Sequence, residues 1–359
     1  MTADSASLLA LADAAEHLTA VRTMADDVLA REWSADRSRD LLDAEAPTWA
    51  VGLWHTVAGL GWADILLEAE DGGGTVPDLC VIAESIGAST APIPFVPVAV
   101  GNWCTGRPQT EGTVGIVPVP SPTPATLEAG AKVVVSGSHG FVPYGDVAER
   151  MLVHARRPDG TATLLQIATE SIGVERSELR PLDAMPSVSL ELHDVTASDD
   201  EVIAFGDEAV DRWAATMQRL TLGWAAELTG VAAGANALGV DYAKHRVAFD
   251  RPIGSFQAIK HRLVDQRAAI EVSRALVARA AVAVESEAAD AAALTSLAAF
   301  WAVDSLRSVP EGVIQVFGGI GYTWEHVAHV FLRRAAVLAA LLGGRGGHRD
   351  AVADWLRNR

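Results

Sequence analysis

The spacing of apolar residues changes twice along this chain of 359 residues, and the change limits the folds open to it. The first and last stretches repeat apolar residues at helical spacing. The middle contains short β-branched runs such as "AKVVVSGSHGFVP" and "SVSLELHDV", separated by Gly, Pro, Asp and Ser. Helices and strands place their apolar faces at different periods. We therefore predict an α+β protein with a helical domain at 1–111, a small antiparallel β-barrel at 112–205 and a four-helix bundle at 206–359.

The helical stretches divide into several predicted elements. "SASLLALADAAEHLTAVRTMADDVLA" and "APTWAVGLWHTVAGLGWADILL" indicate two helices, the second broken at a Gly-Trp pair, and "DLCVIAESIGAS" indicates a third. In the last part of the chain we predict helices at 207–245, 256–285 and 288–307. Pro252 and Gly254 separate the first of these from the second.

One uncharged stretch, "SIGASTAPIPFVPVAVGNWCTG", is long enough to span a bilayer. Its prolines at 92, 94 and 97 would break a spanning helix, so we predict an extended segment and no membrane association. The first residues are acidic where a signal peptide would be basic, which indicates no export.

Charge and cysteine content restrict the partners. The chain carries 46 acidic and 28 basic residues, a net charge of -18, which disfavours nucleic acid and anionic membranes as partners. A phosphorylated cofactor stays possible, because it needs only a few local cations and N–H groups. Cys80 and Cys104 lack CxxC spacing and nearby histidines, so we expect no disulfide, no metal site and a cytoplasmic location.

A Gly-Gly pair in "IQVFGGIGYTWEHVAHVFLRRA", residues 314–335, raises the question of function. Gly318 and Gly319 lie between two predicted helices, where glycine costs backbone entropy. One explanation is an ordinary helix C-cap and turn. The other is that a ligand approaches the bare main chain there.

Two long segments carry a family resemblance. Residues 237–267, "ALGVDYAKHRVAFDRPIGSFQAIKHRLVDQR", resemble the helix–loop–helix signature of the acyl-CoA dehydrogenases. Residues 314–335 resemble that family's Gln-x-x-Gly-Gly-x-Gly-[Tyr/Phe] signature, and "LWHTVAGLGWADILLEAEDGGG" resembles its N-terminal helical domain. The resemblance covers nearly the whole chain and implies the family's three-domain fold.

The resemblance implies FAD as cofactor, shared across a subunit interface. Carried over by position, the residues that would contact the ADP part of a neighbour's FAD are Gln315, Gly318 and Gly319. Arg246 would meet the pyrophosphate, Phe249 would pack on the cofactor and Gln257 would hydrogen-bond nearby. Arg246 is also explained as a surface arginine at a helix end.

The catalytic glutamate that the family uses as base is missing from both of its usual positions. Leu342 stands at one position, and Leu220 or Thr221 stands at the other. We therefore predict no catalytic residue in this chain. Glu227, about two helical turns beyond the second position, is a weak candidate for a relocated base. Two further glutamates lie near the last signature: Glu311, expected at a helix start, and Glu325.

Further departures lie in the parts that would hold the chain's own flavin. The segment expected to face the flavin reads "FVPYG", in which Pro143 has no N–H to donate and Tyr144 is either a stacking partner or a core residue. "VGIVPVPSPTPAT" replaces a second flavin-binding stretch. Asp250 stands where the family has glycine, four residues from Arg246.

This pattern resembles the degenerate subunits of actinobacterial heteromeric α2β2 acyl-CoA dehydrogenases. We therefore expect a heterotetramer in which a catalytic subunit supplies the base, with an acyl-CoA substrate that could carry a sterol-derived side chain. By analogy the electron acceptor is an electron-transfer flavoprotein. Two alternatives stay open: a self-sufficient homo-oligomeric dehydrogenase using Glu227, and a flavin-free scaffold or binding subunit.

Overall fold

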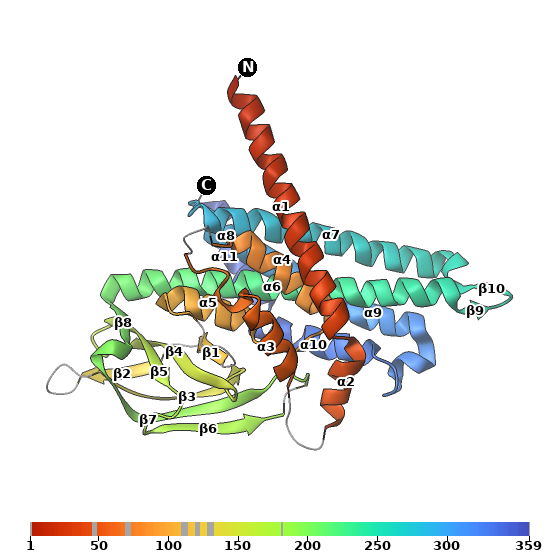
Figure 1. Ribbon diagram of the computed structural model, residues 1–359. Helices are drawn as coiled ribbons and strands as arrows, with labels where there is room; N and C mark the ends of the chain where they lie inside the picture. The colour runs from red at the N-terminus through yellow and green to blue at the C-terminus, as the bar shows by residue number, and fades with distance from the viewer. Residues whose placement is uncertain are drawn as a thin grey trace. The chain divides into compact units, whose positions relative to one another are not determined.

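The computed structural model describes residues 2–44, 49–68, 73–108, 114–118, 123–127, 133–180 and 182–358 (Figure 1). The chain forms two compact units. The first, called the helical unit here, comprises Met1–Arg39, Thr75–Ala91 and Thr221–Arg359. The second, called the sheet unit, comprises Asp40–Gly74 and Pro92–Leu220. Each unit combines segments that are far apart in the sequence, and the domain boundaries predicted at 111 and 205 remain predictions.

The helical unit is built from long helices. Its helices are α1 (Thr2–Glu32), α4 (Val76–Ser89), α6 (Gly206–His245) from Thr221 onward, α7 (Gln257–Glu285), α8 (Ala291–Trp301), α9 (Ser308–Phe317), α10 (Ala328–Leu341) and α11 (Arg345–Arg357). A π-helical turn, Ala302–Leu306, follows α8. The helices predicted at 207–245 and 256–285 are confirmed within one residue at each bound. The helical C-terminal part is therefore as predicted.

Helix α4 illustrates how local sequence sets an element. Thr75 caps its N-terminus, the Asp78 carboxylate accepts a hydrogen bond from the Thr75 N–H, and Pro77 occupies the first turn. Glycines let α4 approach α6 closely: a Cβ at Gly230 would lie 1.8 Å from the Glu84 carbonyl oxygen. Any side chain at this crossing would force the two helices apart.

The sheet unit contains a small, mainly antiparallel sheet, as predicted. Its strands are β1 (Val114–Pro118), β2 (Thr123–Leu127), β3 (Val133–Pro143), β4 (Ala148–Arg156), β5 (Ala162–Ala168), β6 (Val174–Leu179), β7 (Ser187–Ala197) and β8 (Val202–Phe205). The order is β6-β7-β3-β2-β4-β5-β8, and β1 pairs with β4. Strands β1 and β2 run parallel to β4, and the other described pairs are antiparallel.

Helices cover one face of this sheet within the same unit. The buried cluster between them contains Cys104, Leu152, Ala162, Leu164, Ala204, Ala209 and Trp213. These residues come from the end of α5 (Phe95–Thr105), from β4, β5 and β8, and from the first turns of α6. The unit also holds α3 (Val51–Gly59) and a 3-10 turn at Trp62–Asp64, which confirms the predicted Gly-Trp break. Helix α2 (Ala35–Asp43) begins in the helical unit and ends here.

The prediction of an extended segment at 85–106 is wrong. Helix α4 continues to Ser89, and Phe95–Thr105 form the helix α5. Pro94 is the N-cap of α5 and Pro97 lies in its first turn, where the missing N–H would have had no partner in any case. Proline therefore starts this helix rather than preventing it. Within the described ranges, no helix combines the length and the apolar character needed to cross a membrane.

Candidate cofactor site

The first signature segment folds into a tight hairpin between α6 and α7. Strands β9 (Val247–Ala248) and β10 (Arg251–Pro252) pair antiparallel, and the two turn residues, Phe249 and Asp250, have φ of 53° and 60°. Two successive left-handed residues make a type I′ turn. A phenylalanine with positive φ is strained, and its ring is nevertheless 87% exposed. Strained and exposed apolar residues gather where a protein contacts another molecule.

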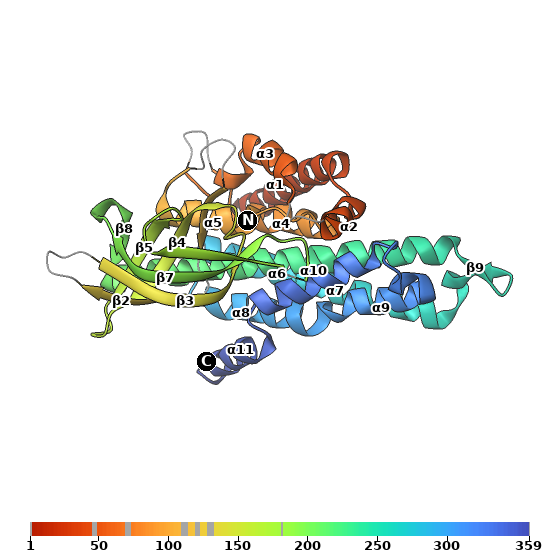
Figure 2. The same ribbon diagram turned by 90° about the horizontal axis from the view of Figure 1, so that it is seen from below.

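The β9–β10 hairpin and α9 lie at the same end of the helical unit (Figure 2). A small apolar cluster joins the two signature segments there. Ala243 of α6, Leu263 of α7 and Val316 of α9 form its buried centre. The rings of Tyr242 and Phe317 are in contact beside it, with centroids 4.3 Å apart. The residues predicted from the two separate signatures, 246–257 and 315–319, are thereby carried by one scaffold.

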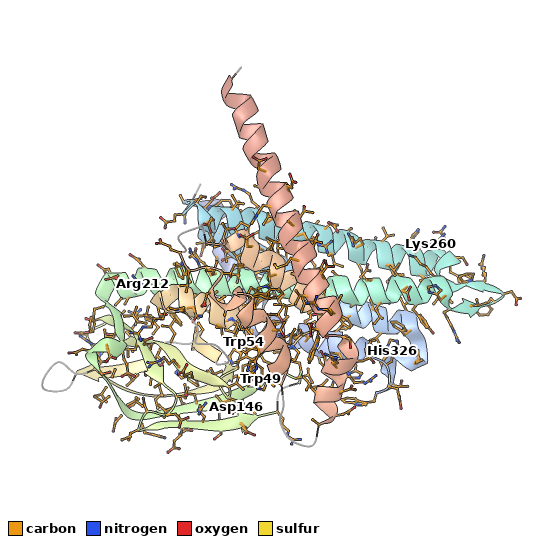
Figure 3. The ribbon with its side chains drawn as sticks, in the orientation of Figure 1. Trp49, Trp54, Asp146, Arg212, Lys260 and His326 are labelled. Carbon is orange, nitrogen blue, oxygen red and sulfur yellow. The ribbon has the colours of Figure 1, made fainter. Side chains whose placement is uncertain are left out.

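The hairpin and the start of α7 form a basic surface on an acidic protein. Residues 244–262 contain one carboxylate, Asp250, and five exposed cations: Lys244, Arg246, Arg251, Lys260 and Arg262. Figure 3 shows Lys260 in the first turns of α7, at the hairpin end of the bundle. The Arg251 guanidinium lies 4.1 Å from the centre of the Phe256 ring. This charge density favours an anionic ligand.

The N-terminus of α7 adds hydrogen-bond donors to that surface. Phe256 occupies the N-cap position and provides no side-chain acceptor, so the first-turn N–H groups of this helix have no side-chain cap. Gln257, the first helical residue, is exposed. An uncapped helix N-terminus beside arginines suits a phosphate or pyrophosphate group.

The two glycines of the second signature, Gly318 and Gly319, have different explanations. Gly318 ends α9 with φ of 65°, which explains a glycine there by backbone conformation alone. Gly319 has no positive φ, and a Cβ built on it would meet no atom within 4 Å. Nothing in the described part of this chain therefore requires the bare backbone at Gly319. Its exposed main chain fits the close approach of a ligand from outside.

Aromatic and apolar side chains beside Gly319 were missed by the sequence reasoning. Ile320, Tyr322 and Trp324 are exposed, and Trp324 stacks on His329 with ring centroids 4.4 Å apart. His326, labelled in Figure 3, packs against Phe317 at 4.1 Å. Burial lowers the pKa of His326, so its ring is neutral at pH 7. The signal in the sequence was the run "IGYTW", whose apolar residues do not follow the helical period.

The residues present fit a dinucleotide with a pyrophosphate. Arg246 can offer its planar fork, α7 its first-turn N–H groups and Gly319 its main chain, while Phe249 supplies an aromatic face. All of Arg246, Phe249, Gln257, Gln315 and Gly319 are exposed, and Gly318 is half-buried. A ligand pocket normally buries most of its ligand. These residues therefore form an exposed face of the unit and not an enclosed pocket.

Glu227 lies away from this exposed face, in the interior of the helical unit. Its side chain is buried, with 4% exposure, and it accepts a hydrogen bond from Arg334 Nε at 2.9 Å. Arg334, at 2% exposure, also donates through Nη2 to the same carboxylate oxygen. From Glu227 to Arg246 the distance along α6 is about 28 Å, at 1.5 Å per residue. The ion pair stabilises the ionised carboxylate and leaves it a poor proton acceptor.

The other positions considered for a base do not provide one. Leu220 and Leu342 are buried, and Thr221 is half-buried. Glu311 lies in the first turn of α9, as predicted for a helix start. Glu325 is exposed, and its pKa is lowered by a hydrogen bond from its own N–H and by one from the Thr323 hydroxyl. A carboxylate with a lowered pKa is a weak base.

The "FVPYG" segment lies at the end of β3 and faces the interior of the sheet unit. Tyr144 is 2% exposed, has φ of 57° and donates its N–H to the Pro186 carbonyl oxygen at 2.6 Å. Of the two interpretations made from the sequence, the core residue is the one that this burial favours. A ring so deeply buried has no free face to stack on a flavin.

Comparison with known proteins relates this chain to the acyl-CoA dehydrogenases. Residues 209–357 match the model of the acyl-CoA dehydrogenase C-terminal domain. The chain is 30% identical over 298 residues to acyl-CoA dehydrogenase IpdE2 of Mycolicibacterium smegmatis, covering 81% of this chain and 83% of that protein. It is also 30% identical to acyl-CoA dehydrogenase FadE34 of Mycobacterium tuberculosis, over 94% of this chain but only 45% of FadE34.

Solved structures share the fold. A steroid acyl-CoA dehydrogenase variant described as Tcur3481-Tcur3483 superposes with a TM-score of 0.84 at 24% identity, covering 96% of this chain and 98% of the other. A chain of the ChsE4-ChsE5 complex from Mycobacterium tuberculosis superposes with a TM-score of 0.84 at 23% identity, covering 95% and 97%. At these identities the likeness concerns the fold.

Proposed function

Because the chain belongs to the acyl-CoA dehydrogenase family, a family of FAD-dependent oxidoreductases, we propose that it is the non-catalytic subunit of a heteromeric member. The observation that carries the proposal is a contrast in this chain. Six residues suited to a dinucleotide lie on one end of the helical unit, while the positions of the catalytic base hold Leu220, Thr221 and Leu342. From this contrast we infer that the chain contributes one half of a shared site.

In the proposed assembly this chain binds and orients the cofactor of a catalytic partner. When bound, FAD would supply the acceptor for the hydride that leaves the β-carbon of an acyl-CoA thioester. Arg246 and the first turn of α7 would hold the pyrophosphate, and the main chain at Gly319 with the Gln315 side chain would contact the ADP part. The Phe249 ring would pack on the cofactor and exclude water from it.

The partner would supply what this chain lacks. It would provide the carboxylate that removes the α-proton of the thioester, and the pocket for the acyl-CoA substrate. The likeness of the fold to a steroid acyl-CoA dehydrogenase and to a chain of the ChsE4-ChsE5 complex supports a heteromeric assembly and a bulky acyl group as the substrate class. The α2β2 stoichiometry is part of the proposal. The proposal includes a cytoplasmic location and an electron-transfer flavoprotein as electron acceptor.

A flavin measurement tests the proposal. We expect the chain purified alone to be colourless and the chain co-purified with a catalytic partner to carry one FAD per heterodimer. The variant Arg246→Gln should lower FAD occupancy at least tenfold at limiting FAD, because it removes a charge-assisted contact worth about 1.5–3 kcal/mol. Arg349→Gln, which changes an exposed arginine on α11, is the matched control.

Two outcomes would point to the alternatives. One FAD per chain in a partner-free preparation that turns over acyl-CoA would support a self-sufficient enzyme with Glu227 as base. The buried ion pair between Glu227 and Arg334 argues against that role. A preparation that stays colourless even beside the catalytic partner would support the flavin-free scaffold.

A further inference from the structure

A pocket in the helical unit lies apart from the candidate cofactor site. Its volume is about 280 Å³, and its walls come from α1, α4, α6 and α7. Figure 1 shows α1 crossing α4 beside α7. The α7 residue Val277, in the pocket wall, is about 30 Å along the helix from Gln257, at 1.5 Å per residue. The cofactor face and this pocket are therefore separate.

Most of the wall is apolar. Leu18, Pro77, Val81, Val277 and Ala281 of the wall have apolar side chains. Two further wall residues, Cys80 and Thr229, add neither a charge nor a free hydroxyl group. Burial, with smaller effects from the Glu84 and Asp78 carboxylates, raises the pKa of the Cys80 thiol to about 12, so it is uncharged at neutral pH. The Thr229 hydroxyl is engaged by Ala225 and Ser273.

The polar part of the wall is one connected cluster. The Glu84 carboxylate, 7% exposed, accepts a hydrogen bond from Arg22 Nη2 on one oxygen and from Arg274 Nε on the other, both at 2.7 Å. Arg274 Nη1 also donates to Glu271 at 2.6 Å. These bonds fix both guanidinium groups in the pocket wall. Among the described residues, Arg22 Nε and Nη1 and Arg274 Nη2 have no hydrogen-bond acceptor.

The cluster is positive on a chain that is strongly negative. Arg22 and Arg274 surround the single carboxylate of Glu84. Including Glu271 and its second partner, Arg267, three arginines still face two glutamates. Burial lowers the pKa of Arg274, but the Glu84 and Glu271 carboxylates raise it more, so the guanidinium keeps its charge. A ligand here meets two guanidinium groups with unused N–H donors and one wall carboxylate that both groups already bind.

We propose that this pocket binds a small monocarboxylic acid, with its apolar chain against α4 and α7 and its carboxylate held by Arg22 and Arg274. A cavity of about 150 Å³ accommodates benzene, so 280 Å³ suits a ligand of about ten non-hydrogen atoms, such as octanoate. The two arginines match the planar carboxylate through their remaining donors. A CoA thioester lacks that carboxylate and is far too large.

Calorimetric titration of octanoate into the full chain at pH 7 tests the proposal. We expect saturable binding at one site. Octan-1-ol, which has the same chain without the charge, should bind at least tenfold more weakly, and so should octanoate to Arg274→Gln. The control is Arg279→Gln, an exposed arginine on the same helix that pairs with Asp290 and lies outside the pocket wall. It should bind octanoate as the wild-type chain does.

A second pair of variants guards against loss of folding. Ala278→Trp fills the pocket from an exposed position on α7 and should abolish binding, while Ala275→Trp, exposed on the same helix outside the wall, should not. No binding to the wild-type chain, equal affinity for octanol, or unchanged affinity of Ala278→Trp would overturn the proposal. The titration needs neither flavin nor partner, so its failure is distinguishable from failure of the proposed function.

Discussion

Glu227 was a candidate catalytic base, but its carboxylate has a structural role in a buried ion pair with Arg334. Its pairing with Arg334 joins α6 to α10 inside the helical unit, across 107 residues of sequence. A buried ion pair is not a large net stabiliser, but losing one partner leaves an uncompensated charge in the interior. The contact therefore restricts substitution at either position independently of any reaction.

The substitution Glu227→Gln should destabilise the chain by about 3 kcal/mol, because Arg334 would stay buried without its counter-charge. Urea unfolding gives the free energy directly, and Glu311→Gln, an exposed glutamate at the start of α9, should change it by less than about 0.5 kcal/mol. The double substitution Glu227→Gln with Arg334→Met should recover part of the loss. Unchanged stability of the single variant would show that the pair does not form.

His154 should make the free energy of unfolding depend on pH. Its ring stacks on Trp213 with centroids 5.3 Å apart, and neither ring nitrogen has a hydrogen-bond partner in the described part of the chain. Burial, and to a smaller extent Arg156, lowers its pKa. The unfolded chain then binds a proton below pH 6.5 that the folded chain does not. Stability should therefore fall as the pH drops from 6.5 toward the lowered pKa.

The variant His154→Phe should keep the ring stack and weaken this acid sensitivity, raising the free energy of unfolding by about 1 kcal/mol at pH 5. Urea unfolding at pH 5 and pH 7.5 measures the difference. His139 and His326 also have lowered pKa values, so part of the pH dependence will remain. His193→Gln, at an exposed histidine, serves as the comparison. If the free energy of unfolding of His154→Phe changed with pH as much as that of the wild-type chain, His154 would not be a source of the acid sensitivity.

At the scale of elements, the close contact between α4 and α6 depends on glycines, which have no side chain to hold the helices apart. The Cβ positions at Gly87 and Gly230 each fall on a carbonyl oxygen of the other helix. Gly230→Ala should therefore destabilise the chain by more than about 2 kcal/mol, although alanine favours an isolated helix by about 1 kcal/mol. The matched control is Gly52→Ala in α3, where a Cβ meets no atom within 4 Å and stability should rise slightly. Thermal unfolding of both variants distinguishes packing from propensity.

Element prediction from the sequence succeeded where the signal was local. The bounds of α6 and α7 followed from Pro252 and Gly254, which interrupt a long helical period. Helix α5 was missed because prolines that would break a helix interior are harmless in its first turn. The burial of Tyr144 and the partner of Glu227 were not predictable, because both depend on residues distant in sequence. The six candidate cofactor residues remain predictions, supported by their location at one end of the helical unit and by the exposure of all but the half-buried Gly318.

For the whole molecule, the proposed function depends on a surface that a single chain does not complete. The scaffold around Ala243, Leu263 and Val316 holds the hairpin and the Gly318–Tyr322 turn in a fixed relation. In the proposed assembly, a preorganised face of this kind would lose little entropy when a partner closes over it. Shape, and not only charge, can therefore select the catalytic subunit.

In the proposed assembly, exposure of the candidate residues would also tie cofactor retention to protein concentration. A dinucleotide held between two subunits dissociates more readily when the subunits separate, so dilution would release flavin even at a constant ratio of the two chains. Free FAD would in turn favour association. In a cell, the supply of flavin and the balanced synthesis of two polypeptides would then regulate the same activity, and an excess of this chain alone would be colourless and idle.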